Sequence, residues 1–153
     1  MIGRILTGRE FNLVLRLVLG GMFLYAAWDK VASPQSFAMS VRAYEIVPFS
    51  ISNLFALCLA WAELAVGILL IVGLFIRSAA GASLMLMVMF FVAIATVLVR
   101  GMVVDCGCFG SEGGSAAGPL LLVRNAFLIV ASVLVMRYND GFLGVDRLMG
   151  RRA

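Results

Sequence analysis

Four long apolar stretches decide what this chain can fold into. They run over about residues 11–28, 51–76, 78–99 and 119–136. Each stretch is close to the roughly 20 residues that a helix needs to cross a bilayer. We expect helices because lipid offers no water to the open edge of a sheet. A closed barrel would need alternating apolar and polar residues, which these stretches lack. The predicted fold class is therefore all-α, a polytopic membrane protein built as a four-transmembrane-helix bundle.

The composition agrees with a membrane protein. Of the 153 residues, 63% are hydrophobic and 13% are charged, which is too apolar for an ordinary soluble domain. We expect a single integral membrane domain over residues 1–153, with outer loops at 29–50 and 100–118. The first stretch could instead be the core of a signal peptide. Arg16 interrupts it and no clean cleavage site follows, which favours a retained helix.

The distribution of lysine and arginine predicts the orientation. Seven of these residues lie near one set of helix ends and three near the other, and the positive-inside rule then places both termini in the cytoplasm. The seven are Arg4, Arg9, Arg77, Arg137, Arg147, Arg151 and Arg152, and the three are Lys30, Arg42 and Arg100. The expected location is the bacterial inner membrane, with both outer loops facing the periplasm. Topology thus explains the net charge of +4, and no nucleic-acid partner is expected.

Two closely spaced cysteines, Cys106 and Cys108, lie in the second outer loop, in the segment DCGCFG at residues 105–110. A thiolate attacks a disulfide, and a second thiol nearby can resolve the mixed disulfide that results. The periplasmic side is also where disulfides persist. Cys106 and Cys108 are therefore the candidate catalytic pair. A structural loop disulfide, half of a metal site and inert thiols remain as other interpretations. No metal is expected, because the chain has no histidine and only one further cysteine.

That third cysteine, Cys58, lies in the second apolar stretch. A lone cysteine in an apolar helix is usually a small packed hydrophobic residue. The functional alternative is a relay thiol between the loop pair and a membrane acceptor. On an ideal helix Cys58 lies about 140° around the axis from Glu63, so these two side chains do not share a face.

Glu63 lies close to the middle of the second predicted span. An ionised carboxylate is costly at that depth and normally faces the inside of a bundle. Its helix face also carries Ala56, Ala60 and Gly67, small residues that let neighbouring helices approach closely. Glu63 is therefore expected to point inward and to have a partner.

Two arginines inside other predicted spans, Arg124 and Arg16, are the expected partners of Glu63. One interpretation is an ion pair that fixes helix packing. The other is a proton or quinone-binding site made by Glu63, Arg124 and Asn125. Together with Arg16 these are the candidate cofactor-binding residues, and quinone is the expected cofactor. Three further charged residues, Asp29, Lys30 and Arg100, are interpreted as end charges at the outer surface.

Several motifs follow one another along nearly the whole chain. They are RLVLGGMFLY at 16–25 before Asp29-Lys30, YEIVP at 44–48, ELAVG at 63–67, GLFIR at 73–77, DCGCFG at 105–110, GP at 118–119 and RN at 124–125. This ordered set resembles the DoxX-like superfamily and, within it, the MauE-type membrane proteins of methylamine utilisation. The resemblance implies a four-helix membrane bundle like that of DsbB and vitamin K epoxide reductase. It also implies association with periplasmic thioredoxin-like proteins and disulfide maturation of exported proteins.

The chain departs from the DsbB-type pattern at its cysteines. One residue rather than two separates Cys106 from Cys108, and the chain has no second exposed pair. This arrangement fits one half of a relay whose other half belongs to another protein.

The expected function is an inner-membrane thiol–disulfide redox protein. Its outward Cys106–Cys108 pair exchanges electrons with a periplasmic thioredoxin-like partner, with a link to the quinone pool. The alternative is a non-enzymatic membrane subunit or assembly factor for maturation of a periplasmic enzyme, with a structural loop disulfide. A small-molecule carrier that uses Glu63 as coupling group is less favoured, because four helices enclose little space. The expected partners are the lipid bilayer, a thioredoxin-like or disulfide-containing protein, and a second copy of this chain in a homo-oligomer.

Overall fold

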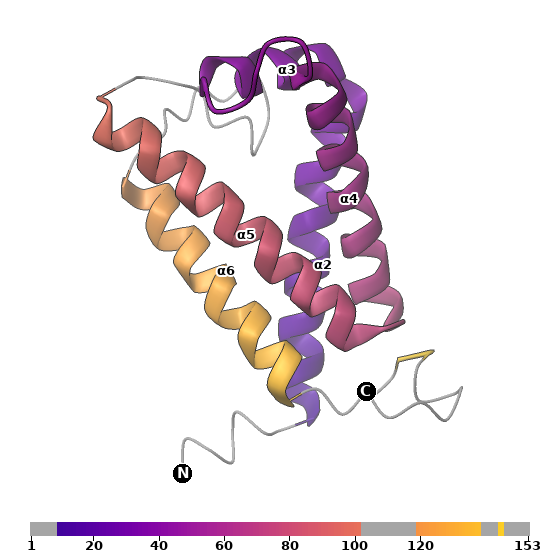
Figure 1. Ribbon diagram of the computed structural model, residues 1–153. Helices are drawn as coiled ribbons and strands as arrows, with labels where there is room; N and C mark the ends of the chain where they lie inside the picture. Colours follow the sequence, from indigo (N-terminus) through magenta and orange to yellow (C-terminus); the bar gives the residue numbers. More distant parts are fainter. Residues whose placement is uncertain (1–8, 102–118, 139–143, 146–153) are drawn as a thin grey trace.

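The computed structural model describes residues 9–101, 119–138 and 144–145, and these residues contain helices and no β-strand (Figure 1). The helices are α2 (Arg9–Ala32), α3 (Pro34–Ala43), α4 (Ser52–Val72), α5 (Ile76–Val99) and α6 (Pro119–Tyr138). In length and composition α2, α4, α5 and α6 are each able to cross a membrane. The predicted all-α class with four membrane-spanning helices is confirmed. Cys106 and Cys108 lie outside the described residues.

Two predicted helix ends were wrong. The first helix continues to Ala32 instead of ending near residue 28. The second ends at Val72 instead of near residue 76, because Gly73 adopts a left-handed conformation with φ 73°. Its amide donates to the Leu69 carbonyl at 2.9 Å, which is the hydrogen bond of a glycine-capped helix end. The apolar residues that follow Gly73 hid this turn from an argument based on hydropathy.

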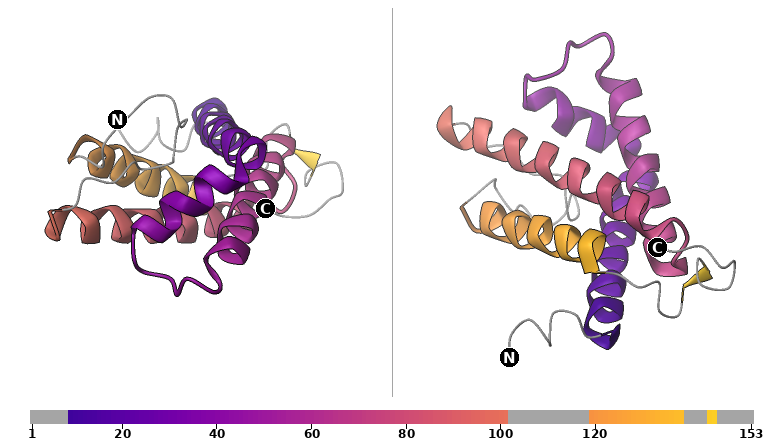
Figure 2. Two further views of the ribbon diagram at one scale, coloured as in Figure 1. Left: turned by 90° about the horizontal axis from the view of Figure 1, so that it is seen from above. Right: turned by 60° about the horizontal axis from the view of Figure 1, so that its bottom comes forward.

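The four long helices form two antiparallel pairs, α2 with α4 and α5 with α6 (Figure 1). The pairs meet near the α4–α5 turn and diverge toward α3, so α5 and α6 are steeply inclined to α2 and α4 (Figure 2). We call these two ends of the molecule the turn end and the α3 end. Arg77 lies at the turn end, and Arg42 and Arg100 lie at the α3 end. The topology prediction requires Arg77 to lie at the opposite end of the bundle from Arg42 and Arg100, and it does. Which end faces the cytoplasm stays a prediction.

All four long helices contribute to one apolar core toward the turn end. Its buried members are Leu19, Phe23, Val66, Leu70, Ile76, Ala79, Ala80 and Val135. Large apolar side chains also cover the outside of the helices, among them Trp28 and Phe127, which are 75% and 78% exposed. A water-soluble protein rarely exposes so much contiguous apolar surface. This outer surface is suited to contact with lipid.

The short helix α3 is held against the start of α4 by hydrogen bonds and apolar packing. The Arg42 guanidinium donates from Nε to Ser52 Oγ at 3.1 Å and from Nη2 to Asn53 Oδ1 at 2.7 Å. It also lies over the Phe49 ring, 4.3 Å from the ring centroid. Phe37 and Ala38 of α3 pack against α4 in a second, smaller core.

The helices α2 and α4 lie close to each other at two glycines. A Cβ atom added to Gly20 would lie 2.7 Å from Ile71 Cγ1 and 3.1 Å from the Gly67 carbonyl oxygen. A Cβ atom added to Gly67 would lie 2.9 Å from Leu24 Cδ2. Only glycine permits this spacing, and Gly67 is one turn from Glu63. The close approach therefore sets how near α2 lies to the part of α4 that carries Glu63.

A matched pair of substitutions on α2 tests this contact. Gly20→Leu is expected to lower the free energy of unfolding by about 1–3 kcal/mol, because the added side chain forces α2 and α4 apart. Gly21→Leu is the control, since nothing lies within 4 Å of a Cβ atom at Gly21. It should leave stability unchanged or raise it, because leucine favours a helix more than glycine does. Thermal unfolding in detergent micelles measures both, and equal effects of the two substitutions would refute the close contact.

Candidate functional site

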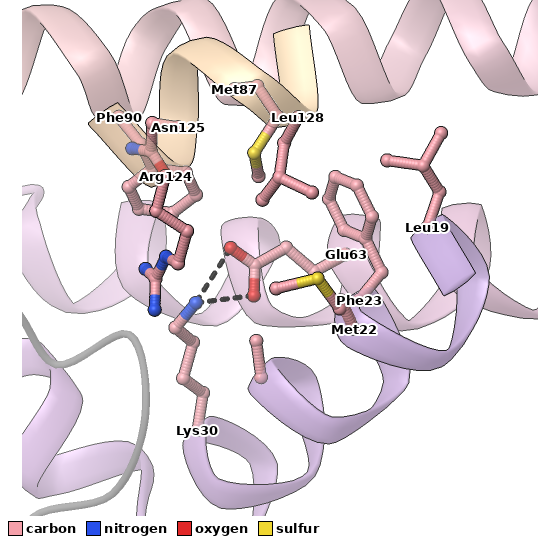
Figure 3. Close-up of a pocket in the computed structure, with 11 residues that line it drawn as sticks. Leu19, Met22, Phe23, Lys30, Glu63, Met87, Phe90, Arg124, Asn125 and Leu128 are labelled. Carbon is pink, nitrogen blue, oxygen red and sulfur yellow. Dashed lines mark hydrogen bonds and ion pairs between the residues drawn. The ribbon is translucent and has the colours of Figure 1, made fainter. Parts of the chain in front are cut away.

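A buried ion pair joins α2 and α4 toward the α3 end (Figure 3). Lys30 Nζ donates to Glu63 Oε1 at 2.7 Å and to Oε2 at 2.5 Å. The two side chains are 2% and 1% exposed. Glu63 points inward, as expected from the cost of a carboxylate in lipid. Its ion-pair partner is Lys30 and not one of the two arginines predicted from the sequence.

The interpretation of Lys30 as an end charge at the outer surface was wrong. It rested on a first helix that ends near residue 28, whereas α2 continues to Ala32 and keeps Lys30 inside the bundle. Phe23, Ala27 and Lys30 are all buried and follow one another at helical spacings of four and three residues. Extending this inward face by one turn would have found Lys30.

The Lys30 ammonium group also contacts two aromatic rings. It lies 5.0 Å from the ring centroid of Phe37 in α3 and 4.8 Å from that of Phe90 in α5. A cation over an aromatic face is attracted by the negative potential of the ring, most strongly where water is excluded. Lys30 therefore connects its own helix to α3, α4 and α5.

A small cavity of about 30 Å³ lies beside the ion pair (Figure 3). Its polar lining consists of Lys30, Glu63, Arg124 and Asn125, and its other walls are apolar. The volume suits one or two water molecules or a single polar group of a ligand. Three of the four polar side chains carry hydrogen-bond donors, so the cavity favours a guest with acceptor oxygens.

Asn125 contributes a buried side-chain amide to this cavity. It is 2% exposed, and its Nδ2 has no hydrogen-bond partner within the described ranges. A buried amide without a partner costs on the order of 1–3 kcal/mol. An acceptor that enters the cavity would recover this cost.

The structure brings together three of the four predicted cofactor-binding residues, since Glu63, Arg124 and Asn125 line one cavity. Arg16 is not among the residues that line it. It is buried at the turn end, where a Cβ atom added to Gly73 would lie 2.9 Å from its Nη1. The physical reason is the length of α2, because the 14 residues from Arg16 to Lys30 span roughly 21 Å of helix.

The third cysteine, Cys58, is an exposed free thiol on α4. The expectation of a packed core residue was therefore wrong. The prediction that Cys58 and Glu63 lie on different faces of this helix was correct, because Glu63 is buried while Cys58 faces outward. Within the described part of the chain, no three side chains of the types His, Cys, Asp and Glu come together as a metal site would require.

Comparison with known proteins places this fold in a family context. The family described as "Methylamine utilisation protein MauE" matches residues 9–138. The chain is 32% identical to methylamine utilization protein MauE of Paracoccus denitrificans over 122 residues, which cover 79% of this chain and 66% of the relative. It is 33% identical to methylamine utilization protein MauE of Methylorubrum extorquens over 108 residues, 70% of this chain and 58% of that relative. The chain thus matches less than two thirds of the length of either relative. No solved structure matches it.

A double-mutant cycle tests the energetic role of the Lys30–Glu63 pair. Lys30→Gln and Glu63→Gln should each lower the free energy of unfolding by about 3–5 kcal/mol, because each leaves an unpaired charge in an apolar interior. The variant with both substitutions should recover much of this loss, since no charge then remains at the contact.

Unfolding in a denaturing detergent, followed by circular dichroism, gives the four free energies of the cycle. Glu45→Gln is the control, because Glu45 is an exposed carboxylate outside the long helices. Losses that simply add in the doubly substituted protein would show that the two side chains do not interact.

Proposed function

The chain belongs to the MauE family, membrane proteins of methylamine utilisation, and we propose that it is a thiol–disulfide redox protein of the bacterial inner membrane. In this proposal Cys106 and Cys108 face the periplasm and exchange disulfides with a thioredoxin-like partner. The exchange serves the maturation of a periplasmic enzyme. The wider DoxX-like relationship inferred from the sequence motifs is part of the same proposal.

The observation that carries the proposal is the position of the polar cavity. The segment with both cysteines connects the end of α5 to the start of α6, and these two helix ends lie at the α3 end (Figure 1). Arg124, a cavity residue, follows Pro119 at the start of α6 by five residues, or roughly 8 Å along the helix. A buried, donor-rich site therefore lies near the helix ends that the cysteine-bearing segment connects.

The thiol step has a balanced form. One loop cysteine, as thiolate, attacks the partner's disulfide, forms a mixed disulfide and releases one partner thiolate. The other loop cysteine attacks the mixed disulfide and releases the second partner thiolate. The partner gains two electrons as a dithiol, and Cys106 and Cys108 end as a disulfide. The same steps in reverse oxidise the partner.

The polar cavity is the proposed site of electron exchange with the quinone pool. Lys30, Arg124 and Asn125 can donate hydrogen bonds to a quinone oxygen, and the unpartnered Nδ2 of Asn125 fits such an acceptor. In the reverse direction, in which the partner is oxidised, the loop ends as a dithiol. A quinone whose oxygen enters this cavity would then supply the acceptor for the two electrons and two protons of that dithiol. Arg16 has no part in this proposal, because it lies at the turn end.

A second candidate function is that of a membrane scaffold for enzyme maturation. The family and both relatives are named for methylamine utilisation, and a name of this kind covers assembly factors as well as redox proteins. In this alternative the loop cysteines form a structural disulfide, and the Lys30–Glu63 pair only fixes helix packing.

Trapping a mixed disulfide distinguishes the two functions. In a Cys58→Ser background, Cys106→Ser or Cys108→Ser should accumulate an adduct with a periplasmic protein, because the resolving thiol is missing. Non-reducing gels of cells quenched with an alkylating agent should show the adduct, and a reductant should abolish it. Mass spectrometry then identifies the trapped protein.

Two controls accompany this experiment. Cys58→Ser alone should leave methylamine-dependent growth unchanged, since Cys58 faces away from the site. The protein without all three cysteines should form no adduct. If neither single variant traps an adduct and the protein without cysteines still supports full growth, the redox proposal fails and the scaffold remains.

A further inference from the structure

A second, larger cavity lies beside the ion pair, between α3, α4 and α5. Its volume is about 300 Å³, and its lining is almost entirely apolar. Four aromatic residues contribute to the walls, namely Phe37, Tyr44, Phe55 and Phe90. The volume is at the lower end of the range for small-molecule sites, which combine mostly apolar walls with a few placed polar groups. We call this the outer cavity, and the 30 Å³ cavity beside Glu63 the inner cavity.

The two cavities share a wall. Phe90 lines both of them, and the Lys30 ammonium lies 4.8 Å from the centroid of its ring. Phe37, on which the same ammonium also lies, faces the outer cavity as well. The Phe90 side chain is therefore a wall shared by the apolar outer cavity and the inner cavity with its donor groups.

The inner cavity contributes what the outer cavity lacks, a buried donor that needs an acceptor. Asn125 Nδ2 is buried and has no hydrogen-bond partner among the described residues, and Asn125 lines the inner cavity beside Lys30 and Arg124 (Figure 3). With about 30 Å³, the inner cavity admits a polar atom of a ligand and not a whole ring. The body of such a ligand must lie elsewhere.

We propose that the two cavities form one site for a prenylated quinone. The quinone ring and the first part of its tail occupy the outer cavity, Phe90 turns aside, and one ring oxygen accepts a hydrogen bond from Asn125. This inference rests on the proposed function and specifies where its electron acceptor binds.

Two other occupants match only half of the site. A phospholipid acyl chain would fill the outer cavity but would bring no oxygen to Asn125. A small free anion would suit the inner donors but would leave the apolar walls of the outer cavity without contacts. A quinone carries both a flat apolar body and acceptor oxygens, so it matches both cavities.

Crosslinking with an azido-ubiquinone analogue tests the site. The protein is prepared with Cys106→Ser and Cys108→Ser in nanodiscs of quinone-free lipid, so that binding is measured apart from thiol chemistry. Crosslinks should map to peptides of α3 and α5, and excess decylubiquinone should remove them. Equal competition by palmitoleic acid would make the outer cavity a lipid site and would overturn the proposal.

Substitutions with matched controls locate the ligand. Ala93 lines the outer cavity, so Ala93→Phe should weaken decylubiquinone competition at least tenfold, while Ala82→Phe on the exposed face of α5 should not change it. Asn125→Leu should weaken it about tenfold, the effect of one lost hydrogen bond, and Ala126→Leu is its exposed control.

A second cavity-filling variant keeps the test valid if Ala93→Phe does not fold. Val47→Trp fills the outer cavity from the segment after α3, outside the packed helices, and should weaken competition equally. Unchanged competition in a folded cavity-filling variant would overturn the inference. Mixed-disulfide trapping needs no quinone, so trapping without quinone binding would refute this site alone. Binding without trapping would instead refute the proposed thiol exchange and leave the site.

Discussion

The ion pair between Lys30 and Glu63 is the interaction on which the rest of the structure depends. Each charge is buried in an apolar interior, where neither would be tolerated alone. Their contact requires α2 to continue past the predicted end of its apolar stretch, and it requires α2 and α4 to lie close together, which Gly20 and Gly67 permit. Because Lys30 also lies against Phe37 and Phe90, the same contact brings α3 and α5 to the site.

Sequence reasoning was reliable where a single physical cost dominates. Burying backbone in lipid demands helices, so the four spans could be predicted from hydropathy, and the inward direction of Glu63 followed from the cost of a carboxylate. The failures came from local geometry. The left-handed Gly73 ends α4 inside an apolar run, and an extra turn of α2 buries Lys30. To choose the partner of Glu63, one must know which residues on neighbouring helices lie at the same level along the bundle. Hydropathy gives no information on this.

The candidate site combines features that the sequence placed far apart. Asn125 and Arg124 come from α6, Glu63 from α4 and Lys30 from α2, and the inclination of the helix pairs lets them line one cavity (Figures 1 and 3). Family membership alone fits a redox protein and an assembly factor equally well. A buried amide donor in a polar cavity that shares Phe90 with a larger apolar cavity is what favours a ligand over a role in packing alone.

The order of the two charges along the chain has a consequence for biogenesis. Lys30 leaves the ribosome before Glu63, and either charge alone in the bilayer costs a few kcal/mol. A hairpin of α2 and α4 with the pair already formed presents no net charge to the lipid from these two groups. The first half of the chain is thus suited to leave the insertion machinery as a closed hairpin, with α3 connecting its two arms.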